Sequence, residues 1–152
     1  MRYMEPTSQE IRMRKDLVQG FTRLITFDMN ACIRPVGSYV TGLYLPTSDI
    51  DMAITFSLQT EIRLGGYSSR SSRSSRLYML IGKIPDSGFS DNVLQASVPL
   101  IRITDKITGI QIDLTESDTH AVKATTKAVQ EWLQHSSPAK PHLFVVRMFL
   151  SN

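Results

Sequence analysis

The 152-residue sequence predicts an α/β domain with a small mixed or antiparallel sheet, helices on one face, and three aspartates on the other face or at its edge. Three patterns support this fold class. Apolar residues recur at helical spacing near the N-terminus, apolar and polar residues alternate along residues 49–56, and two further alternating segments are joined by four residues. The composition, 41% hydrophobic and 20% charged, is that of one globular domain.

The composition also argues against several classes of protein. No apolar run approaches the roughly 18 to 20 residues of a membrane helix, and the start lacks a signal-peptide stretch, so we expect an intracellular protein without membrane contact. The single cysteine, Cys32, cannot form an internal disulfide, and no histidine has cysteine partners at zinc-site spacing. Structural zinc is therefore not expected.

The first helix is expected to run from Thr7 to about Phe27. Thr7 and Glu10 have the spacing of a capping box, in which each side chain satisfies the backbone amide of the other residue. After this box, apolar residues recur on one face of the helix and charged residues lie elsewhere.

A short strand is expected over residues 31–36, followed by a turn at Gly37 and Ser38. Residues 41–45 are then expected to form a helical turn that Pro46 halts, because proline has no backbone N–H and its ring clashes with the preceding turn.

Residues 49–56 alternate with period two, which is typical of a strand with one buried face. Asp49 and Asp51 then point to one side, and the other side carries Ile50, Met52, Ile54 and Phe56. The segment is therefore expected to present two carboxylates together.

The next stretch gives weaker signals. Residues 65–76 contain only glycine, serine, tyrosine and arginine, and we expect a mobile loop because such a segment can bury almost nothing. Its arginines, Arg70, Arg73 and Arg76, equal the net charge of +3, which hints at nucleic acid, although a solvated loop is favoured over RNA contact. Residues 77–84 suggest a short helix, and residues 92–97 suggest a weak strand.

Two better strands are expected over residues 98–104 and 109–115, joined by a hairpin at residues 105–108. A helix capped by Asp118 or Thr119 should then run to about His135. The last segment, residues 142–150, is apolar on nearly every side, so we expect a partner or the remainder of a longer protein to cover it.

Three aspartates are the candidate metal ligands. Asp49 and Asp51 share one strand face, where their carboxylates can hold divalent ions about 3.5 to 4 Å apart. Asp113 lies within an otherwise apolar strand, where an unpaired charge is costly, and a shared cation supplies the reason for it. Gly37 and Ser38 offer free backbone amides and a hydroxyl to a triphosphate at the same sheet edge.

The sequence GSYVTGLYLPTSDID of residues 37–51 is similar to the signature of the non-canonical poly(A) polymerases of the Trf type, in the polymerase-β-like nucleotidyltransferase superfamily. Between residues 57 and 96 almost nothing matches, and Thr115-Glu116 replaces the serine and aromatic usual after the third aspartate. The resemblance extends in matching order over residues 5–14, 98–106, 109–115 and 140–150.

The resemblance implies a polymerase-β-like palm in which Asp49 and Asp51 bind two Mg²⁺ (or Mn²⁺) ions. Asp113 would help to bind the catalytic ion and activate the RNA 3′-hydroxyl, while Gly37 and Ser38 would hold the triphosphate. The implied reaction is template-independent addition of AMP from ATP to an RNA 3′ end, in nuclear RNA surveillance, with an RNA-binding zinc-knuckle protein and a helicase as family partners.

The resemblance also implies a division into domains. Residues 1–152 correspond to the catalytic palm domain, and the second, helical domain that recognises the nucleotide in this family is absent from them. The activity of this short chain alone therefore depends on whether the palm can act without that domain.

Two alternatives stay open from the residues. Within the superfamily, a terminal uridylyltransferase or a CCA-adding enzyme fits the same aspartates, although residues 45–48, Leu-Pro-Thr-Ser, favour the Trf type. From another class, the chain is a catalytically silent fragment that binds a protein partner through its apolar final segment.

Overall fold

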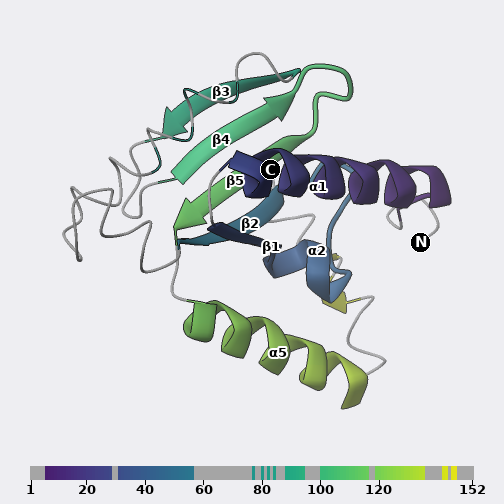
Figure 1. The fold of residues 1–152 in the computed structure, drawn as a ribbon. Coiled ribbons are helices and arrows are strands. Elements are labelled where there is room, and N and C mark those ends of the chain that lie inside the picture. Colours follow the sequence, from purple (N-terminus) through teal and green to yellow (C-terminus); the bar gives the residue numbers. More distant parts are fainter. Residues whose placement is uncertain are drawn as a thin grey trace.

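The computed structural model of the chain contains one five-stranded sheet with helices on both sides (Figure 1). It describes residues 6–28, 31–56, 77, 80, 82, 84, 88–94, 100–116, 119–135, 142–143 and 145–146. The elements follow one another as α1 (Ser8–Asp28), β1 (Ala31–Pro35), α2 (Gly37–Thr41), β2 (Ile50–Phe56), β3 (Phe89–Leu94), β4 (Leu100–Asp105), β5 (Gln111–Glu116) and α5 (Thr119–His135).

The sheet is mixed, as the sequence predicts. Its strand order is β1-β2-β5-β4-β3, in which β2 and β5 are parallel and every other pair is antiparallel. After β2 the chain forms β3 and β4, which pair with each other in antiparallel fashion. The hairpin at residues 105–108 then connects β4 to β5, and β5 lies beside β2. The predicted hairpin is therefore confirmed, and β5 becomes the central strand.

The hydrophobic core lies between α1 and one face of the sheet. Alternation decides which side chains enter it, because successive residues of a strand point to opposite faces. The fully buried side chains are Phe21 and Ile25 of α1, Ile50, Met52 and Ile54 of β2, Ile101 and Ile103 of β4, Ile112 and Leu114 of β5, and Arg14, Leu80 and Ile84.

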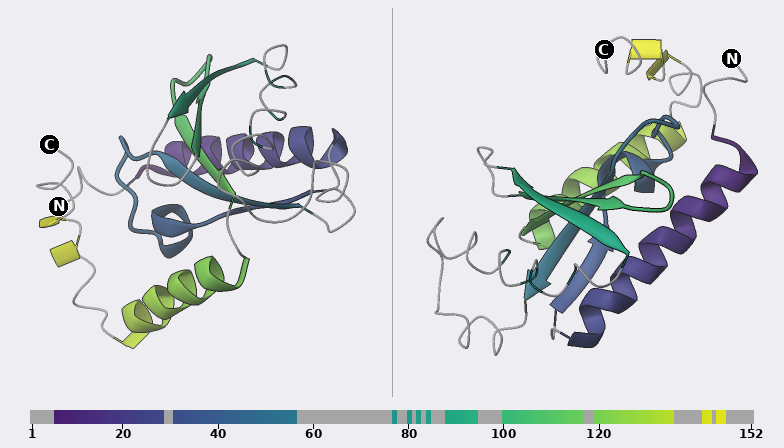
Figure 2. Two further views of the ribbon diagram at one scale, coloured as in Figure 1. Left: turned by 90° about the vertical axis from the view of Figure 1, so that its left-hand side faces the viewer. Right: turned by 90° about the horizontal axis from the view of Figure 1, so that it is seen from above.

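The prediction that all helices lie on one face is wrong. The views in Figures 1 and 2 agree that α1 lies on one side of the sheet, and α2 and α5 lie on the other. Both α2 and α5 contact β2, and Gln130 of α5 donates a hydrogen bond of 3.1 Å to the carbonyl of Val40 in α2. The small side chain of Ala53 on the aspartate face leaves room for them.

The capping box at the start of α1 is confirmed. The amide of Thr7 donates to Glu10 Oε2 at 2.6 Å, and the amide of Glu10 donates to Thr7 Oγ1 at 3.2 Å. The amide of Thr7 and its hydroxyl, which also donates to Glu10 Oε2 at 2.8 Å, lower the pKa of the Glu10 carboxyl, against a smaller opposing effect of desolvation. At its other end α1 stops at Asp28, one residue beyond the predicted end.

The predicted helical turn at residues 41–45 is wrong by four residues, since α2 spans Gly37–Thr41. Gly42 ends the helix because it adopts a left-handed conformation with φ of +70°, and the amide of Leu43 then donates to the carbonyl of Ser38 at 3.0 Å. The glycine, rather than Pro46, therefore stops the helix.

The other boundaries differ by smaller amounts. The strand expected at residues 92–97 begins three residues earlier, because Phe89 pairs with Asp105 at the far end of β4. The helix predicted to end at His135 is confirmed as α5. The loop at residues 65–76 lies outside the described residues, and the helices expected over residues 77–84 and 142–150 lie partly outside them. Within the described helices, none is long and apolar enough to cross a membrane.

The described core predicts that alanine substitutions at Ile112 and Ile107 have different effects on stability. Ile112 is 0% exposed at the centre of the sheet, whereas Ile107 in the hairpin is 91% exposed. We expect Ile112→Ala to lower the free energy of unfolding by about 3 to 4 kcal/mol, because it leaves a cavity. Ile107→Ala should change it by less than about 0.5 kcal/mol. Urea denaturation of both variants checks this, and equal losses would contradict the described core.

Candidate functional site

Two of the predicted aspartates lie side by side in the structure. Asp51 of β2 and Asp113 of β5 are register partners in the parallel pair, so both side chains point to the same face from strands about 4.8 Å apart. Their apolar neighbours, Ile50 and Ile112, are fully buried on the opposite face. The alternation seen in the sequence therefore brings the two carboxylates together.

Asp49 joins them through Arg102 on β4. Arg102 is the register partner of Asp113 across the hairpin, and its Nε and Nη2 donate to the two oxygens of Asp113 at 2.8 and 2.7 Å. The same Nη2 donates to Asp49 Oδ2 at 2.9 Å. One guanidinium thus bridges two of the three predicted metal ligands.

The charge of Arg102 interacts with all three aspartates of this cluster. Its hydrogen bonds to Asp113 raise the pKa of the guanidinium well above its ordinary value. The charges of Asp113, Asp49 and Asp51 add to this effect, and desolvation opposes it. Because Asp51 contributes as well, all three aspartates act on the same cation.

The predicted phosphate-binding turn packs directly against Asp51. The amide of Val36 donates to the backbone carbonyl of Asp51 at 2.9 Å, and Gly37 follows with φ of +62°. A Cβ at Gly37 would stand 2.7 Å from Asp51 Oδ2, and real Cβ atoms essentially never come this close to another heavy atom. Only glycine allows the turn to approach the carboxylate this closely.

Ser38 is the other predicted residue of this turn. It is 6% exposed, and within the part of the chain that the structure describes its Oγ is buried without a hydrogen-bond partner. A buried hydroxyl without a hydrogen bond is costly, and a ligand that accepts a hydrogen bond from it removes that cost.

Arg14 of α1 fixes the loop that leads into Asp49. The side chain is 2% exposed, and it donates to the carbonyls of Pro46 and Ser48 at 2.6 and 2.8 Å. Its guanidinium also lies 5.1 Å from the ring centre of Tyr44. Burial lowers the pKa of Arg14, and Tyr44 is the largest opposing influence.

Sequence reasoning missed both arginines. A signal for Arg102 was present, because the alternation of residues 98–104 places it on the polar face, and a hairpin at residues 105–108 places it opposite Asp113. No comparable signal existed for Arg14, whose acceptors lie 32 and 34 residues further along the chain.

The three carboxylates have the chemistry of a magnesium site, because hard oxygen ligands are those that Mg²⁺ prefers. As the side chains stand, however, the described residues include no group of three His, Cys, Asp or Glu side chains placed to hold a metal ion. Arg102 donates hydrogen bonds to Asp49 Oδ2 and to both oxygens of Asp113. The donor set fits a metal once Asp49 turns away from Arg102 and Asp113 shares its oxygens between Arg102 and the ion.

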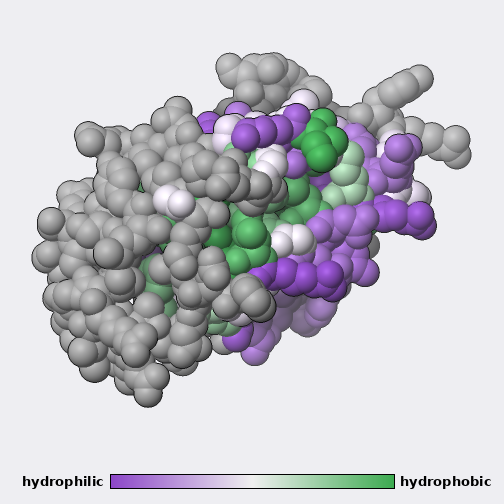
Figure 3. Space-filling view, turned by 45° about the horizontal axis from the view of Figure 1, so that its top comes forward, coloured by the Kyte–Doolittle hydropathy of each residue, from purple (hydrophilic) through white to green (hydrophobic). Residues whose placement is uncertain are grey.

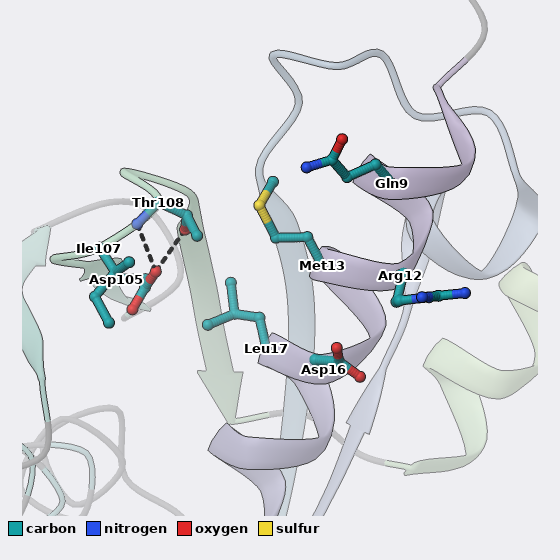
Figure 4. Close-up of a pocket in the computed structure, with 8 residues that line it drawn as sticks. All are labelled: Gln9, Arg12, Met13, Asp16, Leu17, Asp105, Ile107 and Thr108. Carbon is teal, nitrogen blue, oxygen red and sulfur yellow. Dashed lines mark hydrogen bonds between the residues drawn. The ribbon is translucent and has the colours of Figure 1, made fainter.

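A pocket of about 380 Å³ lies away from the aspartates, between the first half of α1 and the hairpin (Figure 4). The carboxylate of Asp105 at its edge is satisfied by the amide and the hydroxyl of Thr108. The space-filling view shows apolar surface flanked by hydrophilic surface on this side of the molecule (Figure 3). None of the predicted site residues lines the pocket.

Comparison with known proteins gives the family. A family model described as "Poly(A) RNA polymerase, mitochondrial-like, central palm domain" matches residues 1–127. Poly(A) RNA polymerase protein 2 of Saccharomyces cerevisiae is 30% identical over 152 residues, which cover 97% of this chain and 24% of that protein. The chain therefore spans about a quarter of the length of this relative.

Two further matches bear on the fold and on activity. The structure of the polymerase core of TRAMP, an RNA surveillance complex, superposes with a TM-score of 0.75 at 29% identity, covering 99% of this chain and 44% of that one. The inactive non-canonical poly(A) RNA polymerase protein Trf4-2 of Drosophila melanogaster is 26% identical, over 98% of this chain and 35% of that protein. The predicted polymerase-β-like palm is confirmed by the first of these matches and the family model.

The turn at Gly37 yields a prediction with a matched control. Gly37 and Gly109 both have positive φ, of +62° and +71°, so alanine at either position costs about 1 to 2 kcal/mol of backbone strain. Only at Gly37 does the added Cβ meet a carboxylate, because nothing lies within 4 Å at Gly109. We expect Gly37→Ala to be the less stable variant in thermal melts and to bind Mn²⁺ at least about tenfold more weakly than Gly109→Ala. Equal behaviour would show that Asp51 is not held against the turn.

Proposed function

The chain belongs to the poly(A) RNA polymerase family of mitochondrial-like central palm domains, and from this premise we propose that it adds nucleotides to an RNA 3′ end without a template. One observation carries the proposal. Asp51 and Asp113 point together from adjacent strands, with Asp49 in the same cluster and the Gly37 turn packed against Asp51. This arrangement places carboxylates and a candidate phosphate-binding turn at one site.

In the proposed reaction, the RNA 3′-hydroxyl attacks the α-phosphate of a nucleoside triphosphate in line, and pyrophosphate leaves. Asp49, Asp51 and Asp113 hold the divalent ions, Mg²⁺ or Mn²⁺. When bound, these ions neutralise the charge that develops on the phosphate and lower the pKa of the attacking hydroxyl. Asp113 lies 15% exposed at the centre of the sheet, where it orients the hydroxyl and accepts its proton.

The incoming nucleotide is proposed to bind at the turn after β1. The buried Oγ of Ser38 donates to a phosphate oxygen, which supplies the partner that this hydroxyl lacks among the described residues. Gly37 lets the phosphate chain lie beside Asp51, because a larger residue would fill that space. We propose ATP as the nucleotide, on the strength of the poly(A) polymerases among the relatives.

The wider setting is also a proposal. We propose that residues 1–152 correspond to the catalytic palm domain. The match to the core of an RNA surveillance complex supports RNA and a protein partner, for which we propose an RNA-binding zinc-knuckle protein and a helicase in the nucleus.

A second candidate function is a catalytically silent scaffold. Two observations favour it: one relative is named as inactive, and Arg102 occupies oxygens that a metal needs. On this reading the palm survives as a folding unit that binds a partner protein, and the aspartates neither bind metal nor support turnover.

Primer extension tests the proposed function. A labelled RNA is incubated with each of the four nucleoside triphosphates in turn and Mg²⁺, using the wild type, Asp113→Asn, and Asp16→Asn as a control on the exposed face of α1. We expect extension with ATP, reduced at least about a hundredfold by Asp113→Asn and unchanged by Asp16→Asn. Extension with UTP instead would identify a uridylyltransferase.

The other outcomes of that experiment separate the alternatives. Equal activity of Asp113→Asn and the wild type would contradict the assigned role of Asp113. If no nucleotide is added, metal-dependent ATP binding is measured next. Binding without turnover points to a palm that needs a further domain, whereas no binding supports the silent scaffold.

A further inference from the structure

Arg102 donates three hydrogen bonds within the aspartate cluster. It uses two nitrogens on the two oxygens of Asp113, at 2.8 and 2.7 Å, and one of these nitrogens also reaches Asp49 at 2.9 Å. A two-nitrogen contact between a guanidinium and a carboxylate is among the stronger and more directional hydrogen-bonding arrangements in proteins. Arg102 is therefore more than a loosely placed surface charge.

The core holds Arg102 in this position. Its neighbours on β4, Ile101 and Ile103, are 0% exposed on the opposite face, and they pair with Leu114 and Ile112 of β5, which are also fully buried. A shift of β4 by one residue would turn these isoleucines into the aspartate cluster. Because that shift is costly, Arg102 stays opposite Asp113.

The same oxygens are those that a divalent ion requires. Asp49 Oδ2 and both oxygens of Asp113 accept from the guanidinium of Arg102, whose charge also interacts with Asp51, the third carboxylate of the group. A metal ion approaching this group meets a positive charge within hydrogen-bond distance of its ligands. It must displace that charge or share oxygens with it.

We propose that Arg102 is a built-in competitor of the divalent ion, which neutralises the aspartates before the ion binds and sets the affinity of the site for it. The inference rests on the proposed function, because it takes Asp49, Asp51 and Asp113 as the metal ligands.

The two contacts of Arg102 play different parts in this exchange. The contact with Asp49 is a single hydrogen bond between side chains that are 32% and 36% exposed, so it opens first. The contact with Asp113 uses two hydrogen bonds to a side chain that is 15% exposed, and it persists. Arg102 thus yields Asp49 to the metal and continues to orient Asp113.

Direct metal binding tests the proposal without any requirement for turnover. Mn²⁺ is titrated into the 152-residue chain, and the free ion is followed by electron paramagnetic resonance. Three proteins are compared: the wild type, Arg102→Met, and Arg34→Met. Arg34 is a matched control, because it is an exposed arginine on the same face of the sheet, on β1, where it contacts Cys32 rather than Asp113.

We expect Arg102→Met to bind Mn²⁺ about tenfold more tightly than the wild type, since it removes both the competitor and its charge. Arg34→Met should change the affinity by less than about twofold. The proposal would be supported equally if Arg102→Met bound Mn²⁺ and neither the wild type nor Arg34→Met bound it. In chelator, Arg102→Met should melt at a lower temperature than the wild type, and saturating Mg²⁺ should raise its melting temperature by more.

The contrary outcomes are distinct. If the wild type binds Mn²⁺ and Arg102→Met binds it no more tightly, competition is overturned while the proposed function stands. Tighter binding by both methionine variants to the same extent would show a general charge effect, which also overturns competition. If neither the wild type nor Arg102→Met binds the ion, both proposals fail.

A second variant covers the case in which Arg102→Met does not fold. Arg102→Lys keeps the positive charge but cannot make the two-nitrogen contact with Asp113. We expect it to bind Mn²⁺ about threefold more tightly than the wild type, because a lysine competes less well for two carboxylates. An affinity equal to or below that of the wild type would overturn the proposal.

Discussion

The in-register parallel pairing of β2 with β5 is the constraint on which the rest of the structure depends. It sets Asp51 beside Asp113 on one face, and it sets Ile50 beside Ile112 in the core on the other. Because side chains alternate along a strand, a slip of one residue would bury carboxylates and expose the core. The hydrophobic core therefore fixes the geometry of the site, and that coupling makes the cluster of like charges structurally possible.

Arg102 and Arg14 stabilise the positions of the aspartates that this geometry brings together. Carboxylates gathered on one face repel each other, and Arg102 from the neighbouring strand offsets that repulsion. Asp49 lies outside the strand, at the end of a loop, and Arg14 on the far side of the sheet holds that loop through the carbonyls of Pro46 and Ser48. Positive charge thus organises a site whose proposed chemistry depends on negative charge.

Much of this arrangement could be predicted from local patterns. Period-two alternation identified β2 and the paired faces of β4 and β5, and the Thr7 to Glu10 spacing identified the start of α1. The parts that could not be predicted depend on contacts between distant segments or on backbone conformation. The left-handed Gly42 ends α2 early, Arg14 acts across more than 30 residues, and α2 and α5 cover the face that carries the aspartates. No local pattern encodes the contacts of Arg14 or the packing of α2 and α5, and only the glycine at position 42 is a local signal for the end of α2.

The measurement that tests the account most directly is a crystal structure of the chain grown with Mn²⁺ and a non-hydrolysable ATP analogue, with the metal located by anomalous scattering. The account predicts anomalous density bonded to oxygens of Asp49, Asp51 and Asp113, the triphosphate against Gly37 and Ser38, and an Arg102 that has left Asp49 but still contacts Asp113. Density elsewhere, or none, with Arg102 still joining Asp49 to Asp113, would contradict it.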